Sequence, residues 1–169
     1  DPISHKIWAS SREGICLIDP ITLQANCYTY AGTNPIGLCY NLNIDNMGNI
    51  WAATFSGHIY QFASSSAIFQ FSQLGNIKYH VNIGAVSSIY TADGTWFWLG
   101  VSPNGLVLYN KKDGKTLYNT DIPGFAELNN TGLSTRITSI IRRYNGQLWF
   151  ATNSNGIMVK GNGKAAEAI

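Results

Sequence analysis

Four short apolar stretches of this chain each contain a tryptophan, and a glycine follows six or seven residues later. The tryptophans are Trp8, Trp51, Trp98 and Trp149, and the glycines are Gly14, Gly57, Gly105 and Gly156. Successive tryptophans are 43, 47 and 51 residues apart. A unit that recurs at this interval indicates a repeat architecture, such as the blades of a propeller. The repeat constrains the fold more than the chemistry, because any ligand would contact the residues between the repeated positions.

The third unit shows how each period divides into strands. Alternating apolar and polar residues predict strands over 86–91 and 96–101, followed by shorter strands over 106–109 and 116–119. Four antiparallel strands per period are what a propeller blade contains.

Glycine turns separate these strands. Asn-Gly and Asp-Gly pairs favour two-residue hairpin loops, because glycine adopts a positive φ at little steric cost. Pairs of this kind at the expected turns are Asp93-Gly94, Asn104-Gly105, Asn145-Gly146 and Asn155-Gly156. We therefore expect these pairs to set the register of the hairpins.

The predicted fold is all-β, a β-propeller segment of about four blades of four-stranded antiparallel sheets. The approximate blades are 1–35, 36–80, 81–130 and 131–169. The two terminal blades look incomplete, since no strand precedes residue 6 and the strand pattern stops after residue 160. Propellers usually contain 4 to 8 blades of about 40 to 50 residues, so we expect a fragment of a larger propeller.

The repeated tryptophans have two interpretations. A tryptophan in every blade points to packing, because small neighbours such as Ala9, Ala52 and Gly100 let adjacent blades approach a large buried ring. The alternative is a set of platforms on which sugar rings stack. We favour the packing role for all four.

The composition argues against several classes of function. Charged residues are 12% of the chain and the net charge is +2, with lysines and arginines mostly spread singly. Nothing in this distribution builds the basic stripe that nucleic-acid binding requires. The sequence has no run of about 20 apolar residues either, so we expect no membrane contact by this segment.

The three cysteines, Cys16, Cys27 and Cys39, match neither a zinc ribbon nor a redox pair in their spacing. We interpret them mainly as small strand residues. One disulfide that leaves a free thiol is the alternative, so the cysteines leave the redox compartment open.

Residues 44–54 read Ile-Asp-Asn-Met-Gly-Asn-Ile-Trp-Ala-Ala-Thr and precede Ser56-Gly57. Two further copies lie within 92–110 and 144–159. This pattern resembles the two-component regulator propeller repeat, in which Ile-x-x-Asp-x-x-Gly-x-Leu-Trp-Ile-Gly-Thr is followed by a glycine and another strand. The resemblance covers nearly the whole chain.

The resemblance implies an extracytoplasmic, periplasmic sensor segment of a hybrid two-component histidine kinase. Propellers of this family often respond to oligosaccharides, so an oligosaccharide ligand is implied on this ground alone. The segment itself would be non-catalytic, and the kinase would lie elsewhere in the parent protein. No cofactor is implied.

Binding residues should lie in loops and at blade mouths, where polar groups and exposed rings meet sugar hydroxyls and faces. The candidates are Arg12, His58, Trp96, Arg142 and Arg143. We expect the ring of Trp96 to point away from the core, on the side opposite to Trp98.

Catalysis finds little support in the sequence. Of the nine carboxylates most lie in turns, where they usually have structural roles, and no two have the spacing of a glycosidase pair. The histidines His5, His58 and His80 share no metal-ligand spacing, so we expect no metal site. Two alternatives to a sensor stay open, a fragment of a propeller lyase or glycosidase and a protein-interaction scaffold.

Exposed blade faces at the two ends predict association. An open sheet or an apolar face promotes pairing with another molecule. We expect these faces to meet the remaining blades of a parent protein or a second copy of the chain, with two copies completing a ring of about eight blades.

Overall fold

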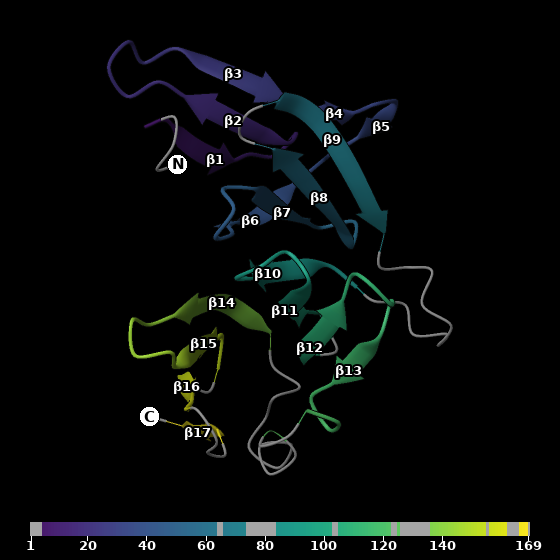
Figure 1. The fold of residues 1–169 in the computed structure, drawn as a ribbon, viewed down its shortest axis with the longest axis vertical. Coiled ribbons are helices and arrows are strands. Elements are labelled where there is room, and N and C mark those ends of the chain that lie inside the picture. The colour runs from purple at the N-terminus through teal and green to yellow at the C-terminus, as the bar shows by residue number, and fades with distance from the viewer. Residues whose placement is uncertain are drawn as a thin grey trace.

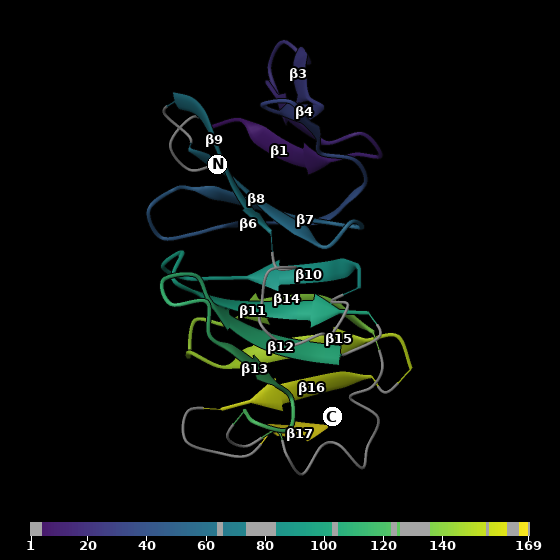
Figure 2. The same cartoon turned by 90° about the vertical axis from the view of Figure 1, so that its right-hand side faces the viewer.

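The computed structural model describes residues 5–63, 66–73, 84–102, 105–122, 125, 136–154, 156–161 and 166–168. Within these residues the chain is all-β, with four small antiparallel sheets and one short hairpin. The sheets lie one after another in chain order, from the purple first sheet to the yellow fourth (Figures 1 and 2). The predicted fold class is confirmed.

Each sheet is a meander, in which strands that follow one another in the chain are hydrogen-bonded neighbours. The first sheet contains β1 (Ile7–Ser10), β2 (Ile15–Ile18) and β3 (Ala25–Tyr28). The second contains β6 (Cys39–Ile44), β7 (Ile50–Thr54), β8 (His58–Ala63) and β9 (Ser66–Gln73). The third contains β10 (Val86–Tyr90), β11 (Trp96–Val101), β12 (Gly105–Asn110) and β13 (Thr116–Tyr118). The fourth contains β14 (Ile137–Arg142), β15 (Leu148–Thr152), β16 (Ile157–Lys160) and β17 (Ala166–Ala168).

The two terminal sheets differ from each other in their number of strands. In the first sheet the described residues form three strands, and β1 takes the place that β7, β11 and β15 take in the others. The fourth sheet is complete, because β17 pairs with β16, and the expectation that its pattern stops after residue 160 is wrong. A short hairpin, β4 (Tyr30–Ala31) and β5 (Asn34–Pro35), also escaped prediction. The exact blade limits stay a prediction.

The repeat extends to the strand register. Trp51 pairs with Asn43, Trp98 with Tyr90 and Trp149 with Ile141, so the three tryptophans occupy equivalent positions. The pairing also shifts near the start of the first strand in the second, third and fourth sheets, as a β-bulge does. Positions in different sheets can therefore be compared residue by residue.

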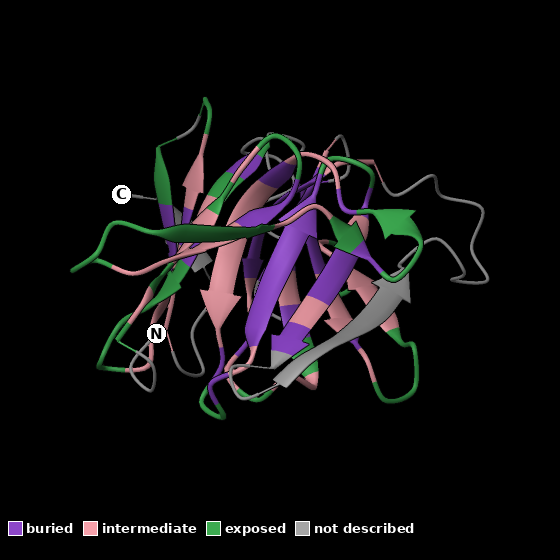
Figure 3. Cartoon of the chain, turned by 90° about the horizontal axis from the view of Figure 1, so that it is seen from above, coloured by how far each residue is buried: buried purple, intermediate pink, exposed green. Residues whose placement is uncertain are grey.

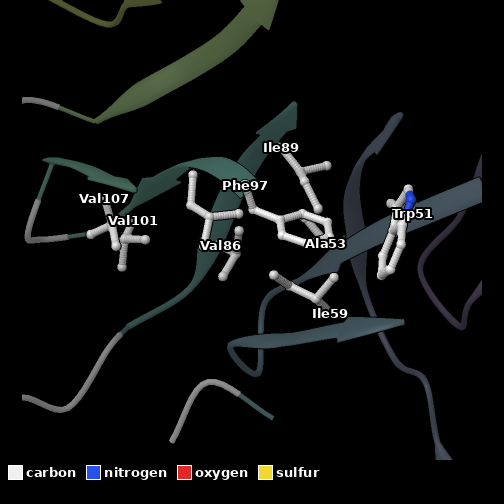
Figure 4. Close-up of a cluster of buried hydrophobic side chains, with 9 residues drawn as sticks. Trp51, Ala53, Ile59, Val86, Ile89, Phe97, Val101 and Val107 are labelled. Carbon is white, nitrogen blue, oxygen red and sulfur yellow. The ribbon is translucent and has the colours of Figure 1, made fainter. Parts of the chain in front are cut away.

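The core fills the spaces between neighbouring sheets. Figure 4 shows Trp51, Ala53 and Ile59 of the second sheet facing Phe97 and Val86 of the third. Similar clusters lie between the first and second sheets and between the third and fourth. Figure 3, seen from above, shows buried residues along strands at the centre of the view and exposed residues at the turns and along an outer strand.

The repeat glycines serve as turn residues. Gly57, Gly105 and Gly156 have φ values of 80°, 75° and 71°, which side chains disfavour. Of the four dipeptides predicted as turns, Asp93-Gly94 and Asn145-Gly146 lie within the described residues, and both glycines have positive φ. The asparagines Asn104 and Asn155 lie outside the described residues.

The cysteines correct the preferred interpretation of the sequence. Cys16 of β2 and Cys27 of β3 are register partners and form a disulfide across the two strands. Cys39 is a free, buried cysteine, and burial raises the pKa of its thiol to about 12. The weaker sequence alternative, one disulfide and one free thiol, is therefore the observed state. Spacing could not decide it, because only pairing of β2 with β3 brings the two residues together.

Candidate functional site

A pocket of about 260 Å³ opens between the third and fourth sheets. Its walls come from the ends of β10 and β14, from the turn before β11 and from the start of β15. The lining residues are Tyr90, Ala92, Asp93, Trp96, Trp98, Arg142, Gly146 and Leu148. Two of the five binding residues predicted from the sequence, Trp96 and Arg142, therefore meet in one site.

Two indole rings contribute to this pocket. Trp96 is 37% exposed, whereas Trp98 is half-buried and packs against Phe125 and Phe150 with ring centroids 5.7 Å away in both cases. The expectation that the Trp96 ring lies opposite to Trp98 is wrong. Residues two apart on a strand share a face, so both indoles line the same pocket. Trp98 thus packs in the core and also borders the site.

Opposite charges stand at the pocket walls. Arg142 is an exposed residue at the end of β14, where it pairs with Leu148. Asp93 lies in the turn before β11, and its Oδ1 accepts the backbone N–H groups of Thr95 at 2.8 Å and Trp96 at 3.3 Å. These bonds fix the turn and leave the second carboxylate oxygen and the guanidinium as polar groups for a ligand.

Arg12 lies elsewhere, at a second hollow of about 250 Å³ beside the first sheet. This hollow is lined by Arg12, Glu13, Thr29, Tyr30, Pro35 and Gly37. Glu13 stands beside the arginine there, and Tyr30 is a 61% exposed ring. The structure does not bring Arg12 near Trp96 and Arg142.

His58 and Arg143 lie outside both pockets. His58 begins β8, its Nδ1 is 2.8 Å from the Ser56 hydroxyl, and burial lowers the pKa of its imidazole. The guanidinium of Arg143 stacks on the ring of Trp149 at 4.9 Å. Both contacts have structural roles, and the two side chains do not converge on one site.

Sequence reasoning missed Tyr90 and Asp93 as site residues. Asp93 belongs to an Asp-Gly turn, so its sequence context signals structure rather than binding. Tyr90 is an ordinary alternating strand residue. The sequence feature that pointed to this site was Trp96. Only the third unit carries an aromatic residue two positions before its repeat tryptophan.

The lining contains one carboxylate, that of Asp93, and no histidine or cysteine. Among the described residues no group of three His, Cys, Asp or Glu side chains could hold a metal ion. No helix in the described part of the chain is long and apolar enough to cross a membrane. The pocket is therefore equipped to bind a ligand through ring faces and hydrogen bonds, with no acid and base pair among its lining residues.

No family model and no curated protein sequence matches the chain. Solved structures do match. The extracellular domain of hybrid two component system BT4673 from B. thetaiotaomicron has a TM-score of 0.65 and 16% identity over 97% of this chain and 20% of that chain. The corresponding domain of BT3049, from the same organism, has a TM-score of 0.65 and 17% identity over 100% of this chain and 27% of that chain.

The RRP9 WD40 repeats are also similar, with a TM-score of 0.66 and 12% identity over 99% of this chain and 48% of that chain. The chain is a β-propeller segment. Identities this low establish the fold alone, since the propeller serves many functions. The segment spans between 20% and 27% of the length of the two extracellular domains.

Proposed function

We propose that this propeller segment is an extracytoplasmic ligand-sensing part of a two-component sensor and is itself non-catalytic. The observation that carries the proposal is the meeting of Trp96 and Arg142 in one pocket between two sheets. The likeness to extracellular domains of hybrid two-component systems supports it, as does the resemblance of the repeat sequence.

The ligand we propose is an oligosaccharide bound by one ring or by one end. An exposed indole offers a flat apolar face, and Arg142, Asp93 and Tyr90 offer hydrogen bonds to hydroxyl groups around it. The volume of about 260 Å³ is slightly below the usual range for binding pockets, which is roughly 300 to 1,000 Å³. A pocket of this size suits one end of an oligosaccharide whose remaining rings extend into solvent.

The cross-strand disulfide supports an extracytoplasmic location. Disulfides persist in oxidising compartments and are rare in reducing ones. Cys27 is exposed, so a reducing cytosol would have access to the bond between Cys16 and Cys27.

The position of the pocket suggests how binding is transmitted. A ligand that contacts both β11 and β14 has a different affinity for different arrangements of the third and fourth sheets, and it therefore shifts their equilibrium. In the sensor this shift would pass through the membrane to a kinase.

A thermal-shift screen of the chain against neutral and acidic oligosaccharides tests the proposal. We expect at least one sugar to raise the melting temperature, and we expect Trp96→Ala and Arg142→Gln to abolish the shift. The matched controls are Tyr144→Ala, which removes a 93% exposed ring outside the pocket, and Arg143→Gln. No shift with any sugar, or loss of the shift in the controls alone, would overturn the assignment.

Two alternative functions, a propeller enzyme and a protein-interaction scaffold, make different predictions. A propeller lyase or glycosidase needs an acid and a base, and the pocket supplies only Asp93, whose Oδ1 is engaged in its turn. A protein-interaction scaffold would bind a protein partner with the same affinity in the Trp96→Ala variant. The pocket favours the sensor because its rings and polar groups converge.

A further inference from the structure

The second sheet contains a carboxylate that binds its repeat tryptophan. The Asp45 side chain is 5% exposed, and its Oδ2 accepts the Trp51 indole N–H at 2.9 Å. The side-chain amide of Asn49 donates to the same oxygen at 2.9 Å. This oxygen lies close to the third sheet, because a Cβ added to Gly94 would come within 3.1 Å of it. An internal anion therefore stands beside the indole where the second and third sheets meet.

The strand register locates the equivalent place in the third sheet. Asp45 lies two residues after the register partner of its repeat tryptophan, and Ala92 lies two residues after the register partner of Trp98. Asn49 and Trp96 are also equivalent, since each lies two residues before its repeat tryptophan. The third sheet thus has a methyl group and an indole ring where the second sheet has the carboxylate and its amide partner.

The pocket between the third and fourth sheets opens at this place. Ala92, Trp96 and Trp98 all line it. Alanine has no side-chain acceptor, so the Trp98 indole N–H lacks the partner that Asp45 gives to Trp51. The pocket is therefore built around a tryptophan whose internal carboxylate has been replaced.

The turn of the third sheet obtains its own acceptors from other side chains. Asp93 Oδ1 accepts two backbone N–H groups of the turn, at 2.8 and 3.3 Å, and the Thr91 hydroxyl accepts that of Gly94 at 2.9 Å. In the second sheet the Asp45 carboxylate accepts the corresponding kind of backbone bond. The third turn therefore folds without a carboxylate at position 92, and the indole is the group that loses an acceptor.

A cation stands at the same pocket. Arg142 lines it from the fourth sheet, whereas the residue at the equivalent position of the third sheet is Thr91. Asp93 is the opposing charge in the lining, and the two N–H groups that donate to its Oδ1 offset part of that charge. Compared with the contact between the second and third sheets, this one has lost the buried anion of Asp45 and gained an arginine. Such a site favours a ligand that brings its own anion.

We infer that the pocket binds the carboxylate of an acidic sugar at one end of an oligosaccharide. The carboxylate takes the place that Asp45 holds in the second unit, and the Trp98 indole N–H and the Arg142 guanidinium donate to it. The exposed ring of Trp96 contacts a face of the sugar. A carboxylate is favoured over a phosphate or sulfate group because the side chain that it replaces is itself a carboxylate. The assignment rests on the proposed function and names the chemical group by which that site selects its ligand.

The first experiment restores the internal carboxylate with Ala92→Asp. The chain has five tryptophans, so its indole N–H groups give few signals in a nitrogen-proton NMR spectrum, and Trp98→Phe identifies that of Trp98. We expect Ala92→Asp to move the Trp98 signal downfield without any ligand, because the new side chain accepts the indole N–H as Asp45 does. Thr120→Asp adds the same charge at an exposed turn residue outside the pocket and should leave the signal in place.

The second experiment compares two disaccharides that differ only in their terminal ring, glucuronic acid in one and glucose in the other. We expect the acidic sugar to move the Trp98 signal and to bind about tenfold more tightly than the neutral one. Ala92→Asp should abolish binding of the acidic sugar, and Arg142→Gln should remove the preference for it. Arg142 is exposed, so its replacement disturbs no filled core, and Arg143→Gln outside the pocket is the matched control.

The outcomes separate this inference from the proposed function. Equal affinity for the acidic and the neutral disaccharide would overturn the carboxylate assignment and leave the sugar sensor in place. Propionate that binds at Trp98 as tightly as the acidic disaccharide would retain the carboxylate site and remove the sugar as its ligand. A Trp98 signal that responds neither to Ala92→Asp nor to the acidic disaccharide would overturn the inference.

Discussion

The second and fourth sheets contain the same turn with opposite charges at its first residue. In the second sheet the Asp45 N–H donates to the Asn49 carbonyl at 3.0 Å, and in the fourth the Arg143 N–H donates to the Gln147 carbonyl at 2.9 Å. A glycine closes both turns by donating to the carbonyl of the first residue. The backbone conformation therefore does not depend on the aspartate.

What the aspartate adds is a partner for the buried tryptophan. Asp45 is 5% exposed, and its Oδ2 accepts the indole N–H of Trp51 at 2.9 Å. Its Oδ1 accepts the backbone N–H groups of Met47 and Asn49, each at 2.9 Å. Trp51 is 1% exposed beneath the third sheet, so its N–H has no access to water.

The fourth sheet lacks this arrangement. Arg143 occupies the position of Asp45 and stacks on the Trp149 ring, and the buried indole Nε1 has no hydrogen-bond partner among the described residues. The indole Nε1 of Trp8 is in the same state. The same turn therefore forms with or without the aspartate, and the polar partner accompanies Trp51, which is the most deeply buried of these three tryptophans.

The largest effect should come from the position where the sheets approach most closely. Ala53, Gly100 and Ala151 occupy one register position in the second, third and fourth sheets. A Cβ on Gly100 would lie 2.6 Å from the carbonyl oxygen of Ile137 and collide with the Ser88 hydroxyl. Gly100→Ala should therefore lower the free energy of unfolding by about 3 kcal/mol in urea denaturation.

A second variant separates the two collisions at Gly100. Adding Ser88→Ala removes the hydroxyl but leaves the Ile137 backbone in place, so it should restore only part of the loss. A Gly100→Ala protein as stable as the unaltered chain would show that the third and fourth sheets separate easily.

Removing the carboxylate of the second sheet should have the next largest effect. Asp45→Ala leaves the Trp51 indole N–H and two backbone N–H groups without their acceptor, and it should cost about 2 to 3 kcal/mol of unfolding free energy. Arg143→Ala is the matched control and should cost little, because its contact is an exposed stack. Equal losses in the two variants would contradict the role assigned to Asp45.

Transferring the aspartate to the fourth sheet should have a smaller effect of opposite sign. Arg143→Asp places a carboxylate where Asp45 contacts its indole, so it should raise the free energy of unfolding by about 1 kcal/mol. Trp149→Phe combined with Arg143→Asp is the control, since phenylalanine has no N–H to satisfy. If the gain in unfolding free energy persisted in the double variant, it would not come from a hydrogen bond to the Trp149 indole.

The smallest effect should be a dependence on mildly acidic pH that His58 of the second sheet contributes. The carbonyl of His58 accepts the Thr54 hydroxyl at 3.0 Å, as that of Gly156 accepts the Thr152 hydroxyl at 3.0 Å. Burial lowers the folded pKa of His58 from 6.5, so the unfolded chain binds more protons just below that pH. Stability should rise as pH increases from the folded pKa to about 6.5 and then level off.

His58→Gln measures this contribution. We expect the variant to lose the rise in stability over the mildly acidic range, as followed by thermal unfolding at a series of pH values. Gln61→Ala, a change in the same strand without a titrating group, should keep it. If the pH dependence of stability were unchanged in His58→Gln, it would have to come from another titrating group.

Much of the fold was predictable because strand alternation and glycine turns are local properties. The strands around Trp98 and the positive φ of Gly105 and Gly156 follow from residues within a few positions of one another. The strand β17 was missed, because the segment that ends in Ala166–Ala168 has no alternation and pairs only with an existing edge. The sequence analysis also did not identify Phe125 as a core residue, yet it is 0% exposed.

The candidate site was predictable only in part. Trp96 and Arg142 lie more than forty residues apart, and no local pattern in the sequence relates one to the other. Packing of the fourth sheet on the third joins them in the pocket, whereas Arg12, His58 and Arg143 come to lie in other places.

The four periods, the all-β class and the glycine turns could be derived from the sequence alone, since these depend on side-chain alternation and on backbone freedom at glycine. The disulfide between Cys16 and Cys27 and the hydrogen bond from the Trp51 indole to Asp45 could be learned only from the three-dimensional structure. Each of these depends on which surfaces are brought together, and a residue's burial or partner is a property of that packing.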